Sequence, residues 1–123
     1  MTPIERLKFE IQAFEGVTWA NAGEPGGSDD ATTPGWVKFA LEKTELGWRT
    51  LEFLAWVFED LARAERHVQL FPTSAPPHLN TPGQCLAFAV ECYMDDTGEG
   101  GTIEEVALYL ARQRSQHWDA CKP

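Results

Sequence analysis

Three Thr-Pro pairs occur along the sequence, and a Thr-Pro pair is often found at the start of an α-helix. The pairs are Thr2-Pro3, Thr33-Pro34 and Thr81-Pro82. A threonine at this place accepts a hydrogen bond from an unpaired backbone N–H, and a proline in the first turn loses no donor that the helix needs. Thr2 with Glu5 and Thr102 with Glu105 also form capping-box patterns. The sequence therefore predicts helix starts near residues 3, 34, 82 and 103.

Apolar residues at three- and four-residue spacing extend these starts into an all-α fold. The expected helices cover about residues 3–15, 34–70, 82–94 and 103–118. Thr44 and Gly47 allow the second to be two helices, near residues 36–43 and 45–70. A Gly- and Asp-rich loop at 21–33, expected to be mobile, and a Pro-rich loop at 71–81 separate them. Residues 1–123 are thus expected to form one domain of four or five helices, packed as a bundle or irregularly.

The charge of the chain excludes some function classes. Its 123 residues carry a formal charge of −9, whereas binding to a phosphate backbone needs a basic surface. The acid is concentrated, because no Lys or Arg occurs between Lys8 and Lys38 or between Arg66 and Arg112. No apolar run is long enough to span a membrane, and the first residues lack a signal-peptide pattern. We expect a cytoplasmic protein that binds neither nucleic acid nor membrane directly.

Two metal-site patterns are partly present in the sequence, and neither is complete. With Asp95 as the first residue of a calcium loop, Gly100 falls at the required sixth position, but Val106 stands at the twelfth, where a bidentate Glu is needed. The possible zinc ligands lack the short paired spacing of zinc sites. They are His78, Cys85, Cys92, His117 and Cys121. The sequence predicts no metal and no cofactor.

The cysteines are expected to stay reduced. Their number, three, is odd, and there is no secretory signal. Cys85 and Cys92 would be about 10 Å apart on the expected helix, which is too far for a disulfide. No nucleophile elbow, phosphate loop or dinucleotide-binding motif is present in the sequence. A small enzyme using Cys and His is therefore only the third hypothesis.

Trp56 stands on the polar side of the expected second helix. The apolar side carries Leu51, Leu54, Phe58 and Leu61. At about 100° per residue, Trp56 falls among charged residues on the opposite side, and Trp48 falls at the edge of that side. Two interpretations stay open. Either another helix covers Trp56, or the ring is exposed among charges, which is the composition of a protein-binding hot spot.

These features favour a non-catalytic, acidic inhibitor that docks on a basic, nucleic-acid-binding surface of a partner protein. Small anti-restriction, anti-CRISPR and toxin-immunity proteins act in this general way, and the similarity is one of size and charge only. The residues expected to bind the partner are Trp48, Trp56, Glu91, Asp95, Asp96, Glu99, Glu104 and Glu105. The alternative is a structural or accessory protein, including a homodimer that buries the Trp56 side of its helix.

Overall fold

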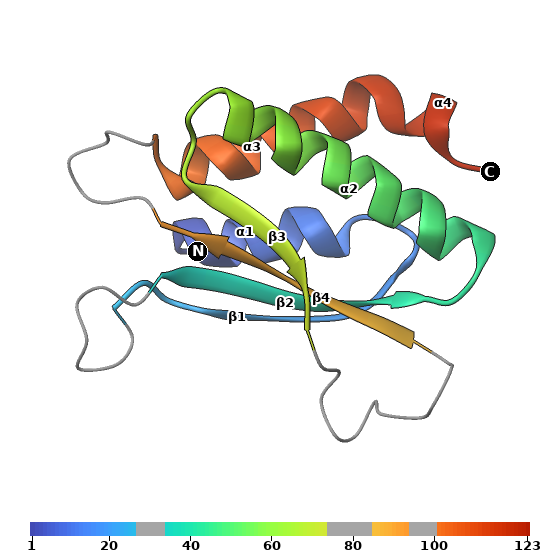
Figure 1. Ribbon diagram of the computed structural model, residues 1–123, viewed down its shortest axis with the longest axis horizontal. Helices are drawn as coiled ribbons and strands as arrows, with labels where there is room; N and C mark the ends of the chain where they lie inside the picture. The colour runs from blue at the N-terminus through green and yellow to red at the C-terminus, as the bar shows by residue number, and fades with distance from the viewer. Residues whose placement is uncertain (27–33, 74–84, 94–100) are drawn as a thin grey trace.

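The structure combines helices with an antiparallel sheet. The computed structural model describes residues 1–26, 34–73, 85–93 and 101–123 (Figure 1). Their elements are, in chain order, α1 (Pro3–Gln12), β1 (Val17–Gly23), β2 (Gly35–Glu42), α2 (Glu45–Arg63), β3 (Val68–Pro72), β4 (Cys85–Cys92), α3 (Ile103–Gln113), the π-helical turn η2 (Arg114–Trp118) and the short α4 (Asp119–Cys121). The strands lie in the order β1-β2-β4-β3, and each neighbouring pair is antiparallel. The fold is α+β, so the all-α prediction is wrong.

Two segments predicted as helices are the central strands of the sheet. β2 pairs with β4 along its whole length, from Gly35 opposite Cys92 to Glu42 opposite Cys85. The predicted helix starts near 34 and 82 are therefore wrong, although Thr33, Thr81 and Pro82 themselves lie outside the described residues. Proline is also common at the first residue of a strand, so the Thr-Pro signal does not distinguish the two elements.

The other boundaries also differ from the prediction. The predicted loop at 21–33 begins inside β1, which continues to Gly23, and residues 27–33 lie outside the described part. The helix expected over 45–70 ends at Arg63, and the chain then enters β3. The Pro-rich loop at 71–81 begins inside β3, and its residues from 74 onward are not described.

Three predicted helices are confirmed, and hydroxyl caps begin all three. The Glu5 N–H donates to Thr2 Oγ1, and the Thr2 N–H donates to the Glu5 carboxylate, which completes the predicted capping box. The Thr102 hydroxyl accepts from the Glu105 N–H at 3.1 Å. Thr44 accepts from the Gly47 N–H at 3.2 Å and caps α2, so a helix does begin at 45, although the segment before it is a strand and not the helix near 36–43 that the sequence allowed.

The described helices lie on one side of the sheet (Figure 1). α1 packs on β1 and β2, α2 packs on β2 and β3, and α3 packs against α1 and α2. We call the opposite side the outer face of the sheet. The core between sheet and helices includes Val37, Phe39 and Leu41 of β2, which are fully buried. Within the described residues, no helix is both long and apolar enough to cross a membrane.

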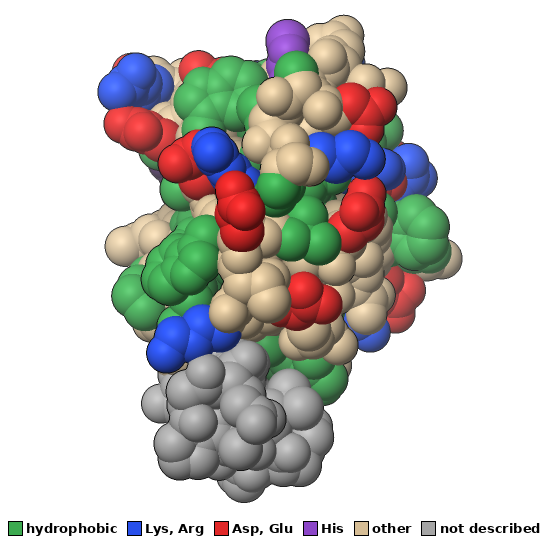
Figure 2. Space-filling model, turned by 90° about the vertical axis from the view of Figure 1, so that its right-hand side faces the viewer, with side chains coloured by type: hydrophobic (Ala, Val, Ile, Leu, Met, Phe, Trp, Pro, Cys, Tyr) green, Lys and Arg blue, Asp and Glu red, His purple; other side chains and the backbone are tan. Residues whose placement is uncertain are grey.

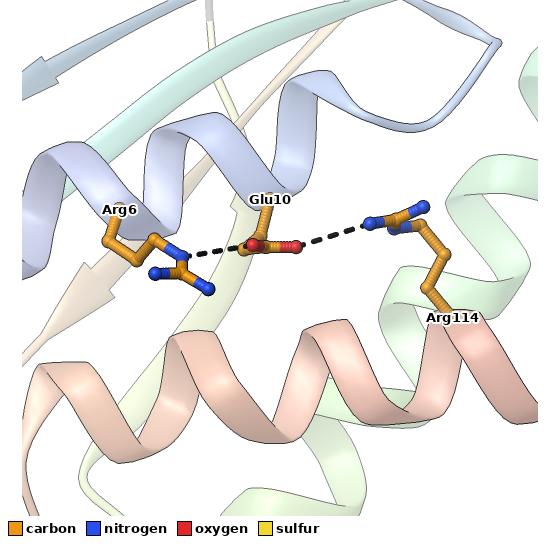
Figure 3. Close-up of polar contacts among 3 residues, drawn as sticks. All are labelled: Arg6, Glu10 and Arg114. Carbon is orange, nitrogen blue, oxygen red and sulfur yellow. Dashed lines mark hydrogen bonds and ion pairs between the residues drawn. The ribbon is translucent and has the colours of Figure 1, made fainter.

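A buried ion-pair cluster ties α1 to the C-terminal segment (Figure 3). Glu10 is only 3% exposed, and it lies between two guanidinium groups. Its carboxylate is 3.0 Å from Arg6 Nε and 3.4 Å from an Arg114 Nη. Because Arg114 begins η2, this cluster fixes the place at which the last turns of the chain meet the rest of the molecule.

Candidate protein-binding surface

Trp56 is half exposed on the outward side of α2. The side chain is 45% exposed, and it is held from two sides. The Phe53 ring lies 5.6 Å away on the same helix, and the His117 ring lies 5.9 Å away in η2, nearly perpendicular to the indole. The last part of the chain therefore supports the tryptophan without covering it, which favours the interpretation of Trp56 as an exposed residue.

The support beneath Trp56 is a buried aromatic cluster. Phe14, Phe53 and Trp118 contact one another at centroid distances of 5.3–5.5 Å. Two successive residues of η2 lie on different sides, because His117 is exposed beside Trp56 whereas Trp118 is buried. Single π-helical turns are frequent at functional sites. We call the exposed pair, Trp56 and His117, the aromatic platform.

Charged side chains on the outward side of α2 are mostly paired. Arg49 lies 3.5 Å from Glu52, and Arg63 lies 2.8 Å from Glu59. Asp60 accepts a hydrogen bond from the Tyr109 hydroxyl of α3, and this contact raises the pKa of Tyr109 to about 12. Figure 2 views the end of the molecule where α2 begins, and there acidic and basic side chains lie side by side with hydrophobic ones between them.

Trp48, the second predicted aromatic contact, is also exposed. It lies in the first turns of α2 and is 50% exposed. Eight residues separate it from Trp56, which places the two about 12 Å apart along the helix and about 80° apart around it. Both tryptophans therefore belong to the outward half of the same helix, and Trp48 lies beyond the platform towards the helix N-terminus.

The predicted acidic residues do not join the platform. Glu104 and Glu105 are exposed in the first turn of α3, where Glu105 lies 3.6 Å from Arg66. His117 is twelve residues further along the chain, about 18 Å away at the rise of an α-helix. Glu91 lies on β4 opposite Trp36, and it accepts a hydrogen bond from the Tyr93 hydroxyl. Asp95, Asp96 and Glu99 lie outside the described residues.

The two described thiols differ in exposure. Cys92 is buried, and burial together with the charge of Glu91 raises its pKa to about 12, whereas Cys121 is exposed. Both are free cysteines. In the described part of the chain, no three His, Cys, Asp or Glu side chains are grouped so as to hold a metal ion. His78 and the side chain of Cys85 fall outside that part.

Sequence reasoning found Trp56 but missed the histidine beside it. His117 was considered only as a zinc ligand with Cys121, because both share one helix. The contact between Trp56 and His117 joins segments about sixty residues apart, and no local pattern encodes it. Comparison with protein families, with curated proteins and with solved structures finds no match to this chain.

Proposed function

We propose that this protein acts by binding another protein, without catalysis, and that the aromatic platform is the centre of the contact. The observation that carries the proposal is the half-exposed Trp56, seated against His117 above a buried aromatic cluster. A rigid indole loses little conformational freedom on binding, and tryptophan is among the residues most enriched in binding hot spots. The paired charges around it form a polar rim.

The partner that fits this protein has a basic surface. The formal charge of −9 speeds the encounter with a basic protein and disfavours acidic ones. A basic surface that normally holds nucleic acid meets this requirement, so we propose an inhibitor that occupies such a surface. In this arrangement the acidic residues act mainly on the association rate, and the aromatic platform acts mainly on the lifetime of the complex.

The test compares Trp56→Ala with Phe9→Ala. Phe9 is another exposed aromatic residue, 55% exposed on α1, and it serves as the matched control. With a partner captured by the wild-type protein and then purified, we expect Trp56→Ala to weaken binding by about 2 kcal/mol or more, mainly through faster dissociation. Phe9→Ala should leave the affinity within about twofold, since Phe9 lies on α1 and is not part of the aromatic platform.

The stability of both variants is measured alongside. Because Trp56 is half exposed, Trp56→Ala should lower the free energy of unfolding by less than the 3–5 kcal/mol typical of a buried Trp. Equal affinities of the two folded variants for the partner would exclude the platform as the binding site. A partner recovered only as a second copy of the chain would point instead to a homodimer.

A further inference from the structure

Among the residues that the structure describes, no strand pairs with the outer edge of β3. β3 is the last strand in the order β1-β2-β4-β3. The Tyr93 N–H donates to the His67 carbonyl, and the Thr73 N–H donates to the Ala87 carbonyl. In an antiparallel ladder the backbone groups of alternate residues point the same way. Residues 67, 69, 71 and 73 therefore face β4, and the backbone groups of residues 68, 70 and 72 face away from the sheet.

This open edge offers more acceptors than donors. The carbonyls of Val68, Leu70 and Pro72 point outward, but the outward donors are fewer. The Val68 N–H already donates to the Arg66 carbonyl at 2.9 Å, and proline has no N–H. Leu70 alone keeps a free donor on this edge within the described strand. In a second copy paired with Leu70 opposite Leu70, the carbonyls of Val68 and Pro72 would find no donors, whereas an extended segment with ordinary N–H groups would satisfy all three carbonyls.

A small groove lies beside this edge, under α2. It has a volume of about 220 Å³. Its α2 wall includes Ala55, Phe58 and Ala62, and its β3 wall includes Val68 and Leu70. Small-molecule sites usually measure about 300–1,000 Å³, so this groove fits one or two side chains better than a free ligand. Ala55 and Ala62 are two helical turns apart on one face, and their small side chains leave the groove open.

We infer that β3 and this groove bind an extended peptide segment of another protein, which adds a fifth strand to the sheet. The residue opposite Leu70 would exchange two backbone hydrogen bonds with it, and its side chain would point to the α2 side with that of Leu70. The segment would therefore carry apolar side chains at alternate positions and no proline at its centre. Glu59, which lines the groove, is already paired with Arg63. The formal charge of −9 on the whole chain favours Lys or Arg at the flanks of the segment.

A library of random ten-residue peptides, displayed on phage, tests this inference with the full chain as the target. We expect the selected peptides to alternate apolar and polar residues, with basic residues at the flanks. The substitution Ala55→Tyr fills the groove, so it should weaken the binding of a synthetic copy of a selected peptide at least tenfold. The matched control is Ala120→Tyr, which changes an equally exposed alanine in α4 and should leave binding unchanged. Failure to select any such peptide, or equal binding by both variants, would overturn the inference.

Amide hydrogen exchange tests the backbone pairing directly. Peptide binding should slow exchange of the Leu70 amide at least tenfold and leave the Gln69 amide, which already faces β4, unchanged. Methylating the peptide nitrogen opposite Leu70 should remove most of the affinity. The Trp56→Ala variant should bind the peptide as the wild type does, because Trp56 does not line the groove. If the Leu70 amide is protected only when the protein concentration is raised, a second copy of the chain occupies this edge, and the inference is overturned.

Discussion

Glu10 is a charged residue that the core retains because two cations face it. Burying an unpaired carboxylate costs several kcal/mol, and an opposing guanidinium offsets that cost. Arg6 comes from the same helix, one turn earlier, and Arg114 comes from η2. The pairing with Arg6 follows from the i, i+4 spacing in the sequence. The pairing with Arg114 does not, because it depends on how the C-terminal segment packs against α1.

We expect Glu10→Gln to lower the free energy of unfolding by about 1–3 kcal/mol. Breaking a fully buried pair costs about 3–5 kcal/mol, but the Arg6 and Arg114 side chains are 45% and 33% exposed, so solvent screens part of the loss. Glu15→Gln is the control, because Glu15 pairs with Lys122 at 3.2 Å on the surface and should cost less than about 0.5 kcal/mol. Urea titration measures both; equal effects would contradict the buried role of Glu10.

Burial should make Cys92 inert under native conditions. The thiolate is the reactive form, and the pKa of Cys92 is raised to about 12. At pH 8, iodoacetamide should modify Cys121 within minutes and should modify Cys92 only after unfolding, as peptide mass mapping would show. Rapid native modification of Cys92 would mean that β4 opens readily.

The same thiol predicts a pH dependence of stability. An unfolded thiol titrates near 9, below the raised pKa of Cys92 in the folded protein. The folded state therefore holds this proton more tightly, and the contribution is complete below pH 9 and is lost as the pH rises towards 12. Comparing the urea midpoints of the wild type and Cys92→Ala across this range isolates the effect. Parallel curves for the two proteins would contradict it.

Among the elements, the helices α1, α2 and α3 were predicted from the sequence, whereas the strands β2 and β4 were predicted as helices. Amphipathic periodicity and hydroxyl caps are local signals, and both were present in the helices. In β2 the buried Val37, Phe39 and Leu41 alternate with Trp36, Lys38 and Ala40, and of these three only Lys38 is polar. With apolar residues on both faces, the period of two that identifies a half-buried strand is absent.

The outer face of the sheet accounts for this composition. Ala40 is fully buried although it belongs to that face, and the Trp36 ring lies so close over Gly23 that a Cβ there would come within 2.2 Å of it. β4 repeats the pattern, with Ala87 and Ala89 alternating with Leu86, Phe88 and Val90. A helical pattern fits such runs as well as a strand pattern does, so the local sequence does not distinguish the two structures. What makes these segments strands is the partner strand, about fifty residues away in the chain.

At Gly47, helix propensity alone predicts the wrong direction for the effect of an alanine on stability. In an exposed helix, Gly→Ala stabilises by about 1 kcal/mol. A Cβ at Gly47, however, would lie 1.7 Å from the carbonyl oxygen of Glu42, at the junction of β2 and α2. We therefore expect Gly47→Ala to destabilise the protein by about 2–3 kcal/mol, as overpacking against a backbone does. Thermal unfolding measures the change, and a raised melting temperature would contradict this close contact.

At the scale of the whole molecule, the sequence predicted the charge and the place of Trp56 on the polar side of α2, but it left open whether Trp56 is exposed and how these features are arranged. Trp48 and Trp56 follow from the helical wheel of α2. The aromatic platform and the groove beside β3 do not, since each joins segments that only tertiary packing brings together. Glu104 and Glu105 were expected to bind the same partner as Trp56, but they lie at the end of α3 that is far from Trp56, because α2 and α3 run in opposite directions.

Charge reversal should separate the rate of encounter from the lifetime of the complex. Replacing Asp95, Asp96 and Glu99 by Lys changes the net charge from −9 to −3. At low salt this should slow association with a basic partner, and the difference from the wild type should shrink as ionic strength rises. The dissociation rate should change less than it does in Trp56→Ala. Stopped-flow kinetics measures both rates, and an unchanged association rate at low salt would refute a role for charge in encounter.

The strand order also has a consequence for synthesis on the ribosome. β2 lies in the middle of the sheet, but its neighbour β4 is encoded about fifty residues later, after α2 and β3. At roughly 5–20 residues per second, β2 emerges some 3–10 seconds before β4 can cover its second edge. During that interval a strand with non-polar side chains on both faces is paired on one side only, by β1. The nascent chain therefore passes through an aggregation-prone stage that the finished protein no longer reveals.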